Sequence, residues 1–228
     1  MKYNSIINNK KILYFIFLLL FSVSFNQYYG YIGVYPIDTF LFFDSGYRTL
    51  NGYFPFKDYW VVTAPLLDVI QSIFFKIFGT SWFSYVLHAS TFNFIITITT
   101  FYTLNKLELN IHFSFLYAFL VSIIAYPIAG TPFPDHHSII FSLLSLYSFI
   151  LFLKTKLDIH IFLLPLFLGF AFLSKQTPTA YIGIILGLAI VIHFLFNFNL
   201  KKILFFLSGV FLIVFIFLLF FIYNEITF

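Results

Sequence analysis

The chain has no cysteine and very few charged residues. Without cysteine it can form no disulfide, thiolate catalyst or zinc–sulfur site, so a metal would need oxygen or imidazole ligands. Charged residues make up 9% of the 228 positions, whereas soluble domains carry roughly 25%. The 12 basic residues are scattered or paired, and no basic block could follow a phosphate backbone. The composition therefore excludes an ordinary soluble domain, and we expect no nucleic-acid partner.

Hydrophobic residues fill most of the sequence. They make up 61% of it, and a bilayer core requires about 20 mostly apolar residues per helix. We therefore predict an all-α, polytopic transmembrane helix bundle of about seven spans, forming a single membrane domain over residues 1–228. No internal repeat or low-complexity linker divides the chain. The predicted spans are 12–33, 82–103, 112–130, 137–153, 160–174, 178–196 and 203–223.

The first span has the character of a signal sequence, because MKYNSIINNKK precedes a long apolar run. No small-x-small cleavage site follows, so we interpret it as an uncleaved span with the N-terminus in the cytoplasm. This orientation puts eight basic residues inside and four outside, as the positive-inside rule requires. The inner ones are Lys2, Lys10, Lys11, Lys106, Lys154, Lys156, Lys201 and Lys202, and the outer ones are Arg48, Lys57, Lys76 and Lys175.

The acidic residues have the opposite distribution. Glu108 and Asp158 fall inside, Glu225 near the far end of the last span, and the other five outside: Asp38, Asp44, Asp58, Asp68 and Asp135. Most titratable groups therefore gather on the external face. The external loop 34–81 is by far the longest, and loops of that length inside a compact bundle are usually functional. We expect short helices within it around 38–51 and 65–78, the second an amphipathic helix at the membrane interface.

Three charged residues of this loop fall in the first expected helix. Asp38 follows the first span, where it is either an N-cap or a functional acid. Asp44 and Arg48 are four residues apart, so they form either a surface ion pair or part of a site. Further on, Lys57 and Asp58 lie in PFKDYW, where interfacial packing and function are equally plausible.

The stretch GTPFPDHHS, residues 130–138, separates two apolar segments. Asp135 could cap the following helix. If the chain is still extended there, Asp135 and His137 leave the same side and could hold one cation; if the helix has begun, they diverge and cannot. Lys175, in SKQTP, is an isolated external cation, suited either to an exposed turn or to an anionic group.

Four polar residues fall in or beside the predicted spans: His88, Asn93, His160 and His193. We predict that hydrogen bonds between helices account for them.

Several short motifs occur in a shared order and on a shared side. They are Asp38 after the first span, Gly52, PFKDYW, a proline-led helix ending in FKIFG, PDHH, and SKQTP. This arrangement resembles the N-terminal part of the GT-C glycosyltransferases, which include protein O-mannosyltransferases, aminoarabinose transferases and oligosaccharyltransferases. The family's aspartate is often followed by a second acid, whereas Thr39 follows Asp38 here. Family members are also longer, so the chain is expected to be truncated at its C-terminus or a short variant.

The resemblance implies an enzyme that transfers a sugar from a polyprenyl-phosphate donor to a lipid or glycan acceptor on the external, periplasmic face of a bacterial inner membrane. It implies that Asp38 or Asp44 is the catalytic base and that Arg48 and Lys175 neutralise the lipid phosphate. Lys57 and Asp58 would lie in the substrate-binding loop. Asp135 and His137 correspond to a motif that holds a divalent cation, Mg²⁺ or Mn²⁺, in one branch of the family.

Two other classes of protein are compatible with the pattern. A transporter or flippase for a lipid-linked or anionic substrate predicts polar or broken helices at mid-membrane and often an inverted repeat. A non-catalytic membrane subunit predicts that the loop acids are dispensable. The acidic external loops favour the glycosyltransferase.

Overall fold

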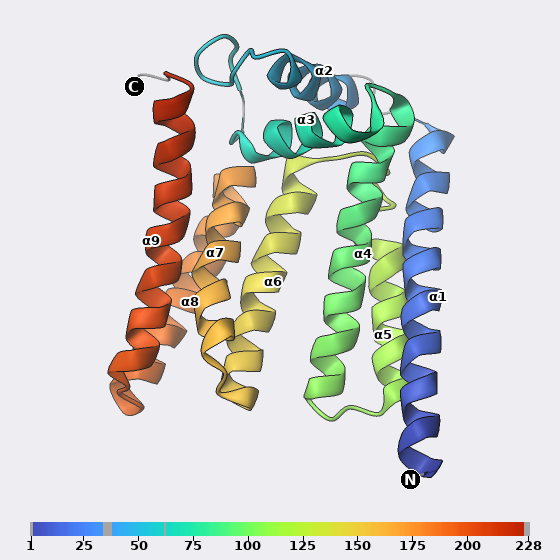
Figure 1. Cartoon of the computed structure of the whole chain (residues 1–228), viewed down its shortest axis with the longest axis vertical. Coiled ribbons are helices and arrows are strands. Elements are labelled where there is room, and N and C mark those ends of the chain that lie inside the picture. Colours follow the sequence, from blue (N-terminus) through green and yellow to red (C-terminus); the bar gives the residue numbers. More distant parts are fainter. Residues whose placement is uncertain (1, 34–37, 62, 226–228) are drawn as a thin grey trace.

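The computed structural model describes residues 2–33, 38–61 and 63–225, with side chains from residue 9 onward. These residues form helices and no strands. Seven of these helices run side by side and form the bundle, and two others, α2 and α3, lie across one end of it (Figure 1). The helices are α1 (Lys2–Ile32), α2 (Asp38–Leu50), α3 (Leu66–Phe78), α4 (Trp82–Lys106), α5 (Ile111–Ile124), α6 (Pro134–Thr155), α7 (Asp158–Ser174), α8 (Gln176–Phe196) and α9 (Leu200–Tyr223).

Local sequence signals explain several helix boundaries. The Ser81 side chain caps α4 in a reciprocal capping box with Ser84. Asn110 and Asn199 cap α5 and α9 by a single bond each, their side-chain oxygens accepting the backbone N–H groups of His112 and Lys202. Pro134 opens α6, a position where its missing N–H costs nothing.

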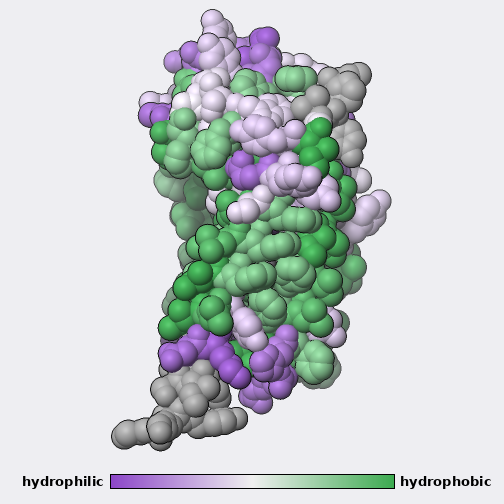
Figure 2. All heavy atoms as spheres, turned by 90° about the vertical axis from the view of Figure 1, so that its right-hand side faces the viewer, coloured by the Kyte–Doolittle hydropathy of each residue, from purple (hydrophilic) through white to green (hydrophobic). Residues whose placement is uncertain are grey.

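Four of the described helices are long and apolar enough to cross a bilayer, as expected of a membrane protein. They are α1 from Asn9 onward, α6, α8 and α9, while α5 and α7 are shorter apolar helices. On the face shown in Figure 2, hydrophobic residues cover the middle of the molecule and more hydrophilic residues lie at its two ends; we call this middle zone the hydrophobic belt. Each of the seven predicted spans overlaps one of the seven helices of the bundle. The number of actual crossings stays a prediction.

Much of the buried face of α4 is polar. Asn93 donates to the backbone oxygens of Ser22 on α1 and Ser122 on α5, at 3.0 and 2.9 Å. The prediction of an interhelical hydrogen bond is confirmed for Asn93. It is wrong for His160 and His193, whose side chains have no hydrogen-bond partner among the described residues; the ring of His193 instead packs edge-on against Phe152.

The two short helices occupy the regions where the long loop was expected to be helical. We call α2, α3 and the segment between them the cap. The N-terminus lies at the opposite end of the bundle, and the C-terminal end of α9 lies beside the cap (Figure 1). The starts of α6 and α8 are at the cap end as well, so residues far apart in sequence meet there.

Candidate functional site

A buried acid, Asp68, lies at the centre of the cap. It projects from α3 and is only 2% exposed. Ser45 on α2 donates a hydrogen bond to one carboxylate oxygen at 2.6 Å, and Tyr59 donates to the other at 2.9 Å. The Tyr59 hydroxyl also lies 2.9 Å from the Thr49 hydroxyl. This network ties α2, α3 and the segment between them together.

Burial dominates the acid–base behaviour of this network. It raises the pKa of Asp68 to about 6, against an ordinary value of 3.8, because the charged carboxylate loses water. The two hydrogen bonds oppose this shift by stabilising the carboxylate. Burial and the neighbouring carboxylate also raise the pKa of the Tyr59 phenol. Tyr59 therefore serves as a neutral donor, and the pKa of Asp68 lies well above that of an exposed carboxyl group.

Asp38 has a contrasting environment. It lies in the first turn of α2 and is exposed. No side chain in residues 9–33, 38–61 or 63–225 forms a hydrogen bond or ion pair with its carboxylate. Its negative charge is favourably positioned at the positive end of the helix dipole. Asp38 is thus available to a molecule that approaches the cap.

Asp44, the other proposed base, is held in an ion pair. Its carboxylate accepts a hydrogen bond from Arg48 Nε at 2.6 Å, and both side chains are about half exposed. This bond, with the charge of Asp44, raises the pKa of Arg48. The spacing of four residues predicted either a surface ion pair or part of a site, and the ion pair is present in the structure.

Lys57 and Asp58 stabilise the segment between α2 and α3. Asp58 accepts the backbone N–H of Phe54 at 2.7 Å, which closes a local turn. Lys57 donates to the backbone oxygen of Asn224 at 3.0 Å and lies 3.5 Å from the Glu225 carboxylate. These contacts connect the cap to the end of α9.

Asp135 and Lys175 form a two-pronged ion pair between the start of α6 and the turn before α8. The Lys175 ammonium donates to both carboxylate oxygens, at 2.7 and 2.8 Å. Both side chains are about one-third exposed. The pair joins residues 40 positions apart and lies at the cap end of the bundle.

Asp135 and His137 were expected to hold one cation if the chain were extended there, but α6 has already begun at this point. The helix already includes Pro134, so residues 135 and 137 point in diverging directions. Asp135 is not the helix cap either, because that position belongs to Phe133. Among the described residues, no cluster of three or more His, Asp or Glu side chains could hold a metal. The pair does not fit a divalent cation.

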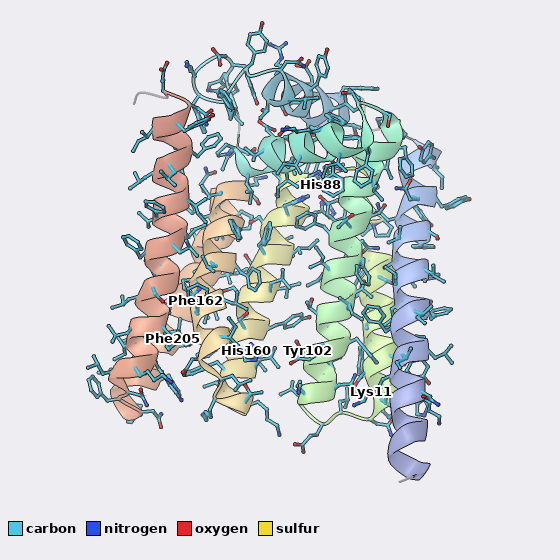
Figure 3. All side chains as sticks on the ribbon, viewed as in Figure 1. Lys11, His88, Tyr102, His160, Phe162 and Phe205 are labelled. Carbon is cyan, nitrogen blue, oxygen red and sulfur yellow. The ribbon has the colours of Figure 1, made fainter. Side chains whose placement is uncertain are left out.

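His137 instead joins a buried chain of hydrogen bonds. Its Nε2 lies 2.9 Å from Nε2 of His88, and His88 Nδ1 lies 2.8 Å from Gln71 Oε1 on α3. His137 Nδ1 meets the hydroxyl of Tyr126, in the turn before α6. Figure 3 shows His88 near the N-terminal end of α4, directly below α3. The interhelical role predicted for His88 is confirmed.

The donor and acceptor roles in this series of hydrogen bonds follow from the groups at its two ends, Gln71 and Tyr126. Gln71 Oε1 can only accept, so His88 donates from Nδ1 and accepts at Nε2. His137 must then donate from Nε2 and accept at Nδ1 from the Tyr126 hydroxyl. Every bond is satisfied with both imidazoles neutral. The chain therefore fastens the cap to α4, α6 and the turn before α6 without burying a charge.

Comparison with protein-family models, with curated proteins and with solved structures finds no match to this chain.

Sequence reasoning missed Asp68 as a site residue and the pairing of Asp135 with Lys175. A signal for the first was present: the buried residues Leu67, Asp68, Gln71 and Phe75 share one face of α3. That face packs on α2 and the bundle, so its polar members must find partners inside the protein. No signal in the sequence pairs residues 135 and 175.

Proposed function

We propose that this chain is a membrane glycosyltransferase that transfers a sugar from a polyprenyl-phosphate donor to a lipid or glycan acceptor at the cap end of the bundle. The motifs that carry the resemblance support this proposal because they lie at one end: the start of α2, the PFKDYW segment, the start of α6 and the turn before α8. Seven helices cross the membrane, with the N-terminus in the cytoplasm and the cap on the external face. The distribution of lysines supports this orientation.

The free carboxylate of Asp38 is the observation that carries the proposal. Asp44 is engaged by Arg48, Asp58 by a backbone N–H, and Asp135 by Lys175. Asp68 is buried. Among the described acids of the cap end, Asp38 alone is exposed and without a partner. It is therefore the acid that a substrate hydroxyl can reach, and we assign it rather than Asp44 as the base.

In the proposed reaction, Asp38 accepts the proton of the acceptor hydroxyl as its oxygen attacks the anomeric carbon. The bond from that carbon to the phosphate oxygen breaks, and the lipid phosphate leaves with the electron pair. A fixed cation stabilises the developing negative charge. Lys175 suits this task because two of its three N–H donors are on Asp135 and the third is left for a phosphate oxygen. Arg48 is the second candidate cation.

The test uses purified protein in lipid nanodiscs with a panel of polyprenyl-monophosphate and polyprenyl-diphosphate hexoses, each offered with an extract of membrane lipids and glycans. Mass spectrometry measures the released polyprenyl phosphate and the glycosylated acceptor. We expect Asp38→Asn to lower turnover about 100-fold or more, the scale of general-base catalysis. The matched control, Asp44→Asn, should retain turnover within a few-fold. Parallel reactions with EDTA, Mg²⁺ or Mn²⁺ measure the need for a cation.

Two results would contradict the proposal. Equal loss of turnover in both variants would remove the assignment of Asp38. Movement of intact lipid-linked sugar across a vesicle membrane, with no cleavage of the sugar–phosphate bond, would instead identify a transporter or flippase.

A further inference from the structure

The end of the bundle opposite the cap contains a cleft between α1 and α4. Its volume is about 760 Å³, within the range of ligand-binding pockets. Lys11 and Tyr102, which line it, lie near the lower ends of the two helices in Figure 3. None of the residues already assigned to the cap contributes to this cleft. The cleft is therefore structurally separate from the candidate site in the cap.

The lining of the cleft changes from charged to apolar with depth. On α1, Lys11 is followed toward the middle of the bundle by Ile12 and Phe15. On the antiparallel α4, Lys106 is followed in the same direction by Tyr102 and then Ile98. The cations thus lie at the end of the bundle, and the apolar wall extends into the hydrophobic belt.

Neither lysine of the cleft is neutralised by an acid. Lys11 and Lys106 are exposed, and neither has an ion-pair partner among the described residues. The Lys106 ammonium lies 5.5 Å from the centre of the Tyr102 ring, a cation–π contact that leaves its charge in place. Glu108 also lines the cleft, but its carboxylate binds Lys154 on α6 at 2.9 Å. The cleft therefore carries a net positive charge.

Its surroundings reinforce this charge. The pKa of Glu108 is lowered by its hydrogen bond to Lys154, so the pair stays ionised and balanced. Asp158, the other described acid at this end, is paired with Lys201 at 2.7 Å. Both acids are thus compensated, and the remaining lysines leave an attractive field for anions.

We propose that this cleft binds an anionic phospholipid, with the headgroup phosphate on Lys11 and Lys106 and one acyl chain along Ile12, Phe15 and Ile98. A soluble anion would use the lysines but leave the apolar wall against water. A neutral lipid would use the wall but leave the lysines without a counter-charge. Only an anionic amphiphile matches both, and basic pockets between membrane helices bind such headgroups. The proposal requires a bilayer around the bundle and does not depend on glycosyl transfer.

The test measures lipid binding and thermal unfolding of the full chain in neutral detergent micelles. Native mass spectrometry counts bound phosphatidylglycerol, with phosphatidylcholine and free glycerol phosphate as the other arms. We expect phosphatidylglycerol to bind and raise the unfolding temperature, whereas the other two do not. The double variant Lys11→Gln/Lys106→Gln should lower phosphatidylglycerol affinity about 30-fold, from about 1 kcal/mol for each lysine. The matched control is Lys10→Gln, adjacent on α1 but outside the cleft.

A second variant tests the apolar wall. Ile98→Trp should fill the cleft and lower phosphatidylglycerol binding while both lysines remain. Unfolding without added lipid shows that each variant is folded. The proposal is overturned if the double variant binds phosphatidylglycerol as the wild type does, if Lys10→Gln loses as much affinity, or if phosphatidylcholine binds equally. Effective competition by glycerol phosphate would assign the lysines to a soluble anion instead.

Discussion

The acids of the cap share a residue type but not a chemistry, because their environments differ. Asp38 is exposed and has no partner among the described residues, whereas Asp68 is enclosed and bonded to Ser45 and Tyr59. Asp135 forms an ion pair with Lys175. These differences separate a candidate base from an acid that stabilises the fold.

The raised pKa of Asp68 predicts how stability depends on pH. Between its ordinary value of 3.8 and about 6, the folded protein binds more protons than the unfolded chain. Stability should therefore fall as the pH rises through this window and level off above it. The total change is on the order of 3 kcal/mol, from about 1.4 kcal/mol per pKa unit. Thermal unfolding in detergent between pH 4 and 8 measures it.

The control for this dependence is Asp68→Asn. The amide keeps the shape of the side chain but cannot titrate, so its unfolding temperature should change much less between pH 4 and 6. If the variant keeps the full pH dependence of the wild type, another group is responsible.

Sequence spacing predicted the partners of charged side chains only where both residues lie on the same helix. The Asp44–Arg48 pair follows from a separation of four residues. The partners of Asp68 lie 23 residues upstream on α2 and 9 residues upstream in the turn. Such distant partners depend on how the helices pack, which a local pattern does not encode.

At the scale of elements, the contact between α2 and α3 depends on a glycine. Gly46 is buried on α2, and a Cβ added there would lie 2.5 Å from Cγ and 2.8 Å from Cβ of Gln71. These distances are too short for carbon atoms, so the two helices approach this closely only because residue 46 has no side chain. Gln71 in turn bonds His88, so this packing positions the end of the buried histidine chain.

We expect Gly46→Ala to destabilise the protein by about 1–3 kcal/mol through overpacking. The matched control is Gly187→Ala on α8, where nothing lies within 4 Å of the added Cβ. Both changes gain similar helix propensity, so the difference between them isolates the steric effect. Unfolding temperatures of the two variants provide the measurement. Equal stability of the two would show that α2 and α3 can separate without cost.

The helices themselves were largely predictable, whereas their exact ends and their packing were not. Apolar length located the seven long segments. The segment predicted as 112–130 nevertheless ends at Ile124, because Pro127 and Gly130 follow in a turn that closes on the backbone of Gly30. Gly130 has a φ of +69° there, a conformation that glycine adopts without strain.

The whole molecule has two chemically different ends. The cap end carries most of the acids and the candidate site, and the opposite end carries most lysines and the proposed lipid cleft. Because the chain has no cysteine, a single introduced cysteine reports its own side of the membrane without interference. Suitable positions are Tyr53 in the cap, 56% exposed, and Phe198 in the turn before α9, 76% exposed.

We expect a membrane-impermeant maleimide to label Tyr53→Cys in intact spheroplasts. Phe198→Cys should react only after the membrane is disrupted. Labelling yield by mass shift on a gel is the measurement, and the cysteine-free wild type is the blank. The reverse pattern would place the cap in the cytoplasm and contradict the positive-inside prediction.

Three properties could be predicted from the sequence by itself: the apolar surroundings of the bundle, the helical nature of its segments, and the separation of most acids from most lysines. These properties depend on composition and on local order along the chain. Only the tertiary structure decided which acids are free, paired or buried, and it separated Asp135 from His137 while bringing His137 to His88. The physical reason is that charge and hydrogen-bond partners are chosen by distance in space, and residues such as Asp135 and Lys175 become neighbours only after the helices pack.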